Sequence, residues 1–194
     1  MIETYYRILK HGPDGRLVKD TGLIPSHSYV IQFLELIYAA MKRLNFQGTD
    51  VTGAESYMYT ISHDMVTKGR ADPPGGNDTY GIVVGTNAGT TAEDNENYAL
   101  DTKILHSGIG GAGELNYQAV TFVSPRVVGP NIDLDITRTF LNETGGTITV
   151  KEIGIICKNS SITKYHLLLR DVVTDEDVED GYTLTVVYTL RTTV

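Results

Sequence analysis

Three groups of residues in this sequence could carry chemistry by their type and spacing. Gly108, Gly110 and Gly113 reproduce the G-x-G-x-x-G spacing of a dinucleotide-binding loop. Residues 175–180 place five carboxylates in six positions, and such a run could chelate calcium through oxygen ligands. Histidine supplies metal ligands and general bases, and the chain has five: His11, His27, His63, His106 and His166.

The surrounding pattern argues against chemistry at each group. No periodic helix follows the glycines of residues 108–113, and the flanking pattern is antiparallel β, so we predict a flexible loop. Residues 175–180 lack the ligand spacing and central glycine of a calcium loop, so we predict a solvated turn between two strands, with calcium binding as the alternative. The histidines are scattered, with no i, i+4 pair and no nearby cysteine. Ser62, His63 and Asp64 are adjacent on a predicted strand, where neighbours point to opposite faces. We therefore predict no catalytic, cofactor-binding or metal-binding residue, and a protein that is not an enzyme.

Composition narrows the class of protein and its partners. The 194 residues suffice for one domain with its own core. A formal net charge of -8 would repel phosphate backbones, so nucleic acid is not an expected partner. Cys157 is the single cysteine, so no disulfide can form within the chain and no cysteine pair can bind zinc, which suits a reducing cytosol. No uncharged apolar run reaches membrane-spanning length, and we expect no membrane partner.

The first part of the chain predicts a β-hairpin and one long helix. Residues 4–9 and 16–24 are strand-like and flank the turn formers of residues 11–15. Residues 29–44 show helical spacing, and Ser26 or Ser28 is a natural N-cap. The spacing is carried by Val30, Phe33, Leu34, Ile37, Met41 and Leu44.

Apolar residues also lie outside that helical stripe. Ile31, Leu36 and Ala40 widen the apolar surface beyond what a single sheet can cover. We therefore predict that these three residues contact another subunit.

The rest of the chain predicts an antiparallel β-sandwich, with jelly-roll connections. Alternation is clear within residues 131–141, 146–157 and 182–193, and further strands are expected at 57–61, 80–84, 114–124 and 163–173. Turn-rich segments at 69–78 and 85–95 predict long surface loops. The expected single domain comprises a hairpin plus helix (1–48), a loop-rich segment with short strands (49–113) and the main run of antiparallel strands (114–194).

Tyrosine dominates the aromatic residues, with twelve tyrosines against four phenylalanines and no tryptophan. Tyrosine is favoured where a ring is buried and its hydroxyl stays wet, as at protein interfaces and on sugar-binding faces. Ordinary packing between strands explains the same excess. The count alone does not choose between these interpretations.

Four segments together resemble virion structural proteins of tailed bacteriophages. The pattern reads R-T-F at 138–140, N-E-T-G-G-T-I-T-V-K-E-I-G at 142–154, L-L-L-R-D-V at 167–172 and G-Y-T-L-T-V-V-Y-T-L at 181–190. The opening Y-R-I at 6–8 with P-D-G at 13–15, and residues 28–33, resemble the start of such proteins. The resemblance leaves residues 46–97 unmatched.

The resemblance implies a structural subunit of a phage particle, assembled in the host cytoplasm. A capsid decoration or auxiliary protein is the leading expectation, with the chain itself, guessed as a trimer, and the major capsid protein as partners. The alternative is a tail, collar or fibre protein that binds a receptor or a carbohydrate. An enzyme of unrecognised type is the third hypothesis, and carboxylates and a histidine converging in a deep pocket would favour it.

Overall fold

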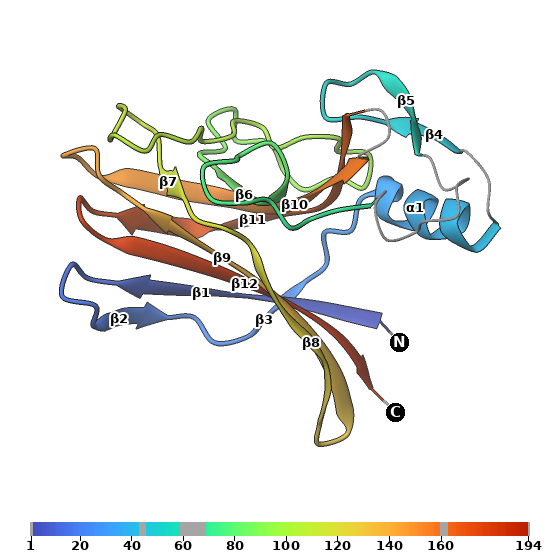
Figure 1. The fold of residues 1–194 in the computed structure, drawn as a ribbon, viewed down its shortest axis with the longest axis horizontal. Helices are drawn as coiled ribbons and strands as arrows, with labels where there is room; N and C mark the ends of the chain where they lie inside the picture. The colour runs from blue at the N-terminus through green and yellow to red at the C-terminus, as the bar shows by residue number, and fades with distance from the viewer. Residues whose placement is uncertain (1, 43–45, 59–68, 160–162, 194) are drawn as a thin grey trace.

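The computed structural model describes residues 2–42, 46–58, 69–159 and 163–193, and within them the fold is mostly β (Figure 1). Two antiparallel sheets form its body, and one short helix, α1 (Ile31–Lys42), lies at one end. The predicted β-rich class with antiparallel pairing is therefore confirmed.

The larger sheet is centred on β12 (Thr183–Thr193), which pairs with β1 (Ile2–His11) on one side and β9 (Asn131–Leu141) on the other. The pairing with β9 runs the full length of β12, and the pairing with β1 runs from Thr183 to Thr192. Apolar and polar residues alternate along most of β12, which fixes this register. The outer strands are β2 (Leu17–Asp20) and β3 (Ile24–Ser26), which pair with β1, and β7 (Asn116–Tyr117) and β8 (Thr121–Val128), which pair with β9.

The second sheet has three strands in the order β11 (Lys164–Val178), β10 (Ile148–Asn159) and β6 (Gly81–Gly85). All five residues of β6 are buried, as expected for a strand covered on both faces. A separate hairpin joins β4 (Phe46–Thr49) to β5 (Glu55–Met58). The predicted strand at 57–61 corresponds to the end of β5, and residues 59–61 lie outside the described part of the chain.

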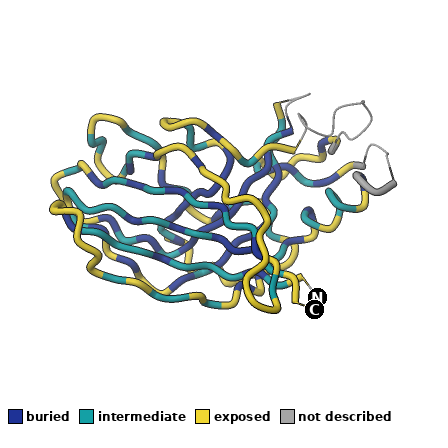
Figure 2. Tube along the Cα trace, turned by 60° about the horizontal axis from the view of Figure 1, so that its bottom comes forward, coloured by how far each residue is buried: buried dark blue, intermediate teal, exposed yellow. Residues whose placement is uncertain are grey.

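Both sheets contribute to one apolar core. The larger sheet supplies Phe140 and Tyr188, and the three-stranded sheet supplies Ile153 and Leu167, all fully buried in the same cluster. Figure 2 shows this burial along the middle of the strands, with exposure at the loops. Burial of alternate residues from two sheets is the main stabilising contribution in such a fold.

The prediction of a long helix at residues 29–44 is wrong in its length. The helix has 12 residues and begins at Ile31, because the preceding residues are extended. Tyr29 forms a β-bridge with Leu169, and Val30 donates its backbone N–H to the Leu168 carbonyl at 3.2 Å. Pairing with the edge of β11 therefore takes the backbone groups that a longer helix would need.

The predicted N-cap is also wrong. Neither Ser26 nor Ser28 caps α1, because both hydroxyls donate to the buried carboxylate of Asp171, at 3.0 and 2.9 Å. The predicted buried stripe changes as well: Leu34 is 65% exposed, whereas Gln32 is buried. The helix thus turns part of its apolar surface outwards.

Three strand boundaries differ from those predicted. Residues 16–24 divide into β2 and β3 around Gly22, whose φ of +66° is a conformation that glycine tolerates without strain. Residues 114–124 divide into β7 and β8. The predicted acidic turn at 175–180 is mostly strand, since β11 runs to Val178 and only residues after it turn.

Candidate interaction surfaces

Several polar residues of the phage-like motifs lie inside the protein. They come from β9, β10, β11, β12 and the turn after β9, and each is buried: Arg138, Asn142, Glu152, Arg170, Asp171 and Tyr188. Burying such groups is costly unless each finds a partner. Their contacts therefore show what the motifs do in this chain.

Glu152 and Arg170 form a buried ion pair between β10 and β11. Arg170 Nε donates to Glu152 Oε2 at 2.9 Å, and the other carboxylate oxygen accepts the backbone N–H of Thr102 at 2.8 Å. Arg170 then reaches the loop before residue 100, donating to the Ala92 carbonyl at 2.8 Å and to Asn97 Oδ1 at 3.0 Å. The pair thereby fixes the loop of residues 87–102 to the three-stranded sheet.

Asp171 sits between the two sheets and accepts three hydroxyl hydrogen bonds. They come from Ser26, from Ser28 and from Tyr188, whose hydroxyl lies 2.8 Å from Oδ2. Burial raises the pKa of Asp171, and it also raises the pKa of Tyr188, well above its ordinary value. This cluster joins β3, β11 and β12 and leaves no exposed reactive oxygen, since Asp171 is 2% exposed.

Arg138 is a fully buried guanidinium that contacts backbone carbonyls. It donates to the carbonyls of Ile82 at 2.9 Å, Gln118 at 2.8 Å and Tyr80 at 3.2 Å, and to the Asn77 carbonyl. Its carbon Cζ lies 4.7 Å from the centre of the Tyr117 ring. Burial lowers the pKa of Arg138 to about 10. Arg138 therefore holds loop carbonyls against the larger sheet.

Among the described histidines, His166 contacts a serine, which could be a catalytic partner. Its Nε2 lies 2.9 Å from Ser56 Oγ, and both residues are buried. Asp50 is nearby, but its carboxylate accepts from Lys164 Nζ at 2.6 Å and from the backbone of Thr52 at 2.9 Å. Burial lowers the pKa of His166 to about 4, so the ring is neutral at physiological pH. A buried serine and a neutral imidazole here link β5 to β11.

The other candidate sites are a glycine-containing loop and a run of acidic residues that are paired within the chain. The glycines of residues 108–113 form a loop that precedes the short strand β7 and not a helix. In the acidic run, Asp175 pairs with Lys151, Glu176 with Lys19 and Asp177 with Thr149. Within the described residues, no three His, Cys, Asp or Glu side chains converge where a metal ion could sit. His63 and Asp64 lie outside the described part.

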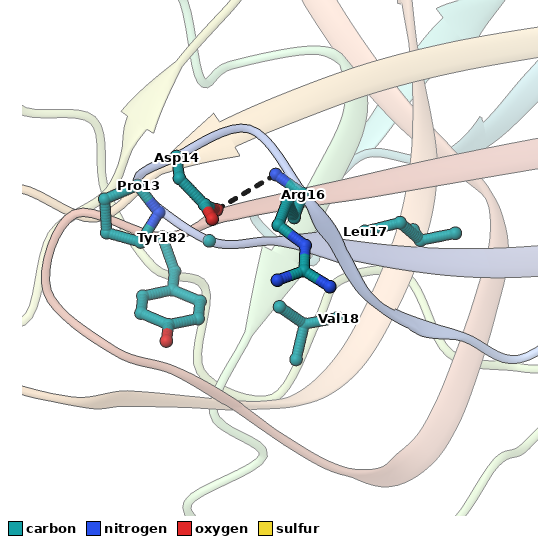
Figure 3. Close-up of a pocket in the computed structure, with 7 residues that line it drawn as sticks. Pro13, Asp14, Arg16, Leu17, Val18 and Tyr182 are labelled. Atoms are coloured by element: carbon teal, nitrogen blue, oxygen red, sulfur yellow. Dashed lines mark hydrogen bonds between the residues drawn. The ribbon is translucent and has the colours of Figure 1, made fainter.

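A shallow pocket lies beside the turn between β1 and β2 (Figure 3). Its volume is about 450 Å³, and the Tyr182 ring faces Arg16 and Val18 across it. Asp14 accepts the backbone N–H of Arg16 at 3.0 Å and so closes the turn above. The pocket brings an aromatic ring and a guanidinium together beside the Asp14 carboxylate, one of whose oxygens accepts the hydrogen bond of the turn.

The predicted interface on α1 is placed as follows. Ile31 is 52% exposed, Leu36 is half-buried, and the side chain of Ala40 lies outside the described part. The structure adds two exposed apolar residues to Ile31 at helical spacing, Leu34 at 65% and Tyr38 at 48%. We refer to Ile31, Leu34 and Tyr38 as the helix face.

A second exposed apolar surface lies on the hairpin of β8 and β9, which extends away from the body of the fold (Figure 1). All eight residues of β8 are exposed, including Phe122 and Val127. Sequence reasoning missed this hairpin because it assigned residues 114–124 and 131–141 to a packed sandwich. The available signal was Pro125, since proline in a strand marks an edge.

Comparison with known proteins adds no relative. No protein-family model, no curated protein and no solved structure matches this chain. Among the described residues, no helix is both long and apolar enough to span a membrane. The two exposed apolar surfaces and the buried polar contacts are therefore the features of this chain that bear on its function.

Proposed function

We propose that this protein is a non-enzymatic structural subunit that acts by assembling with other protein chains. The observation that carries the proposal is the hairpin of β8 and β9, whose outer strand has no buried residue and yet carries Phe122, Val123, Val127 and Val128. A contiguous exposed apolar surface on a folded protein marks an interaction site.

The setting we propose is the particle of a tailed bacteriophage, with a capsid decoration or auxiliary subunit as the leading role. The resemblance of residues 138–190 to virion proteins supports it. In this chain the polar members of that pattern, such as Glu152, Arg170 and Asp171, hold loops and sheets together. These contacts favour a role for the pattern in a rigid scaffold over a role in a chemical reaction. The proposed partners are further copies of the chain and the major capsid protein.

The proposed architecture is a two-layer β-sandwich with jelly-roll connections. The apolar cluster that includes Phe140 and Tyr188 of one sheet with Ile153 and Leu167 of the other supports two facing layers. Such a scaffold leaves loops and sheet edges available for partners. A subunit of a particle needs both a rigid body and exposed edges.

A receptor- or carbohydrate-binding role in a tail, collar or fibre is the second candidate. The observation that favours it is the pocket of Figure 3, where the Tyr182 ring offers a stacking surface beside Arg16. A glycan array would test it, with Tyr182→Ala as the comparison. Binding of one glycan class that this substitution removes would favour this role over decoration.

The test of the leading proposal combines particle analysis with mass in solution. Phage particles purified from lysates would be examined for the chain by mass spectrometry, and the purified chain by sedimentation velocity. We expect the chain in the particles at a fixed ratio to the major capsid protein. A chain that is monomeric at high concentration and absent from particles would refute the assembly role.

A further inference from the structure

The helix α1 packs with polar residues towards the body of the fold and apolar residues towards solvent. Gln32 is 1% exposed and Ala39 is fully buried. Glu35 lies between them at helical spacing, three residues after Gln32 and four before Ala39. We refer to the side of α1 that carries these three residues as the inner side. Because the helix face is exposed instead, the arrangement reverses the usual amphipathic pattern of a surface helix.

Two buried side-chain oxygens on the inner side have no hydrogen-bond donor. Among the described residues, these oxygens are Gln32 Oε1 and Glu35 Oε2. Glu35 as a whole is half-buried, but its Oε2 atom is buried. An unpaired buried acceptor costs free energy, and the cost is larger when the acceptor belongs to an ionised carboxylate. The inner side therefore lacks donors for two of its acceptors.

The elements that pack against α1 offer Glu35 no compensating charge. The helix packs on β11 and β4, and β4 contains no titratable residue. Burial is what raises the pKa of Glu35 above its ordinary value of 4.5. The charged and titratable groups of β11 contact other residues: Lys164 contacts Asp50, Tyr165 contacts Tyr80, His166 contacts Ser56, Arg170 contacts Glu152, Asp171 contacts Ser26, Ser28 and Tyr188, Asp175 contacts Lys151, Glu176 contacts Lys19, and Asp177 contacts Thr149.

We propose that α1 is a pH-dependent element, which packs tightly on β11 and β4 when the Glu35 carboxyl is protonated and loosens when that proton is lost to solvent. The protonated carboxyl has an O–H group, so it supplies a donor on a side that has unpaired acceptors. The ionised carboxylate instead leaves a charged oxygen without a donor. Loosening of the helix brings this oxygen into water, which solvates it.

Proton binding fixes the direction of the effect. In the packed helix the carboxyl binds its proton more tightly than in the loosened helix, where water surrounds it and its pKa is the ordinary 4.5. The contribution of Glu35 to packing is therefore fully present below pH 4.5 and is lost as the pH rises through the raised pKa. A pKa difference of one unit corresponds to a change of about tenfold in the packing equilibrium.

The same helix carries the helix face, so loosening of α1 changes how Ile31, Leu34 and Tyr38 are presented to a partner. The inference goes beyond the proposed assembly role and does not require it, because the packing of α1 is measured within a single chain. A chain that assembles without a pH-dependent helix would overturn this inference and leave the assembly role in place.

Hydrogen–deuterium exchange of the full chain measures the packing of α1. Exchange rates of the α1 amides at about pH 5 and about pH 7.5, each compared with the intrinsic rate of an unfolded chain at that pH, give protection factors. We expect the ratio of protection at the lower pH to that at the higher pH to be larger in the wild-type chain than in Glu35→Gln. The glutamine stays neutral and keeps an amide donor at both pH values.

Glu96→Gln is the matched control, because Glu96 is exposed in the loop of residues 87–102, and it should keep the wild-type ratio. His166 titrates in part of this pH range with the opposite effect on stability. All three chains retain His166, so the comparison between them isolates Glu35. A Glu35→Gln chain with the wild-type ratio would overturn the proposal.

If Glu35→Gln does not fold, titration of the Glu35 carboxyl carbon by nuclear magnetic resonance in the wild-type chain decides the question. A midpoint above 4.5 supports the proposal, since only a packed, proton-binding Glu35 produces it. A midpoint at the ordinary 4.5 would overturn it.

Discussion

The guanidinium of Arg170 lies 2.9 Å from the Glu152 carboxylate in an ion pair whose side chains are 1% and 0% exposed. Glu152 comes from β10 and Arg170 from β11, and both also bond to the loop of residues 87–102. A pair so deeply buried gives little net stabilisation over an apolar pair, but removal of one partner leaves an unpaired buried charge. The pair therefore makes the position of that loop depend on both residues.

We predict that Glu152→Gln destabilises the protein by about 3 kcal/mol or more, because Arg170 would remain charged and buried. Urea denaturation followed by circular dichroism would measure the free energy of unfolding. Lys151→Gln is the matched control, since Lys151 is adjacent and its ion pair with Asp175 is exposed, so its loss should cost under about 1 kcal/mol. Equal effects of the two substitutions would show that the buried pair is not stabilising the loop.

Stability should fall in mild acid because of His166. Burial lowers the pKa of His166 to about 4 from an ordinary value of 6.5, so between these pH values the unfolded chain binds more protons than the folded chain. Stability from this residue is therefore fully present above pH 6.5 and decreases as pH falls towards 4, by on the order of 3 kcal/mol.

His166→Gln should remove this slope between pH 6.5 and 4, whatever its effect at pH 7. Unfolding free energies at three pH values across the window would measure it. Ser56→Ala is the control, because it removes the hydrogen bond to Nε2 but leaves the imidazole to titrate. An unchanged slope in His166→Gln would assign the pH dependence between pH 6.5 and 4 to other groups.

Arg138 should tolerate neither an apolar nor a lysine substitution. Arg138→Met would leave buried carbonyls, including those of Tyr80 and Ile82, without their donor. We expect the free energy of unfolding to fall by about 3 kcal/mol, because buried carbonyls that lose their donor are removed from water without a replacement hydrogen bond. Arg138→Lys should recover only part of this, since one ammonium cannot match the planar set of donors. Full stability of Arg138→Met in thermal unfolding would contradict this role.

The sequence predicted the strands better than the surfaces. Residues 131–141 and 182–193 were placed to within a residue because most of their side chains alternate between apolar and polar. The helix was misplaced because Tyr29 and Val30 have helical spacing but pair with β11, a contact distant in sequence that periodicity cannot reveal. Ser26 and Ser28 had the residue type of an N-cap, and only the fold shows that Asp171 lies within reach of both.

The candidate site was only partly predictable for the same physical reason. Ile31 was predicted to contact another subunit because it lies outside the apolar stripe of the helix. It is 52% exposed, and the contact itself stays a prediction. Val127 and Ile132 lie on strands with ordinary alternation, which predicts a buried face. Only the register shows that this face continues beyond the second sheet. The pattern of one strand does not specify how long its covering layer is.

A charge placed on the helix face should weaken association of the chain. Ile31→Asp should weaken association more than it weakens folding, because Ile31 is 52% exposed and the charge would be desolvated only in a contact with a partner. Leu36→Asp was expected to act in the same way, but Leu36 is half-buried, so that substitution would also disturb packing within the chain.

Ile109→Asp is the matched control, since Ile109 is 96% exposed in the loop of residues 108–113. Sedimentation velocity would compare the three chains at equal concentration, with thermal unfolding to confirm equal stability. If Ile31→Asp and Ile109→Asp associate as the wild-type chain does, the helix face takes no part in assembly.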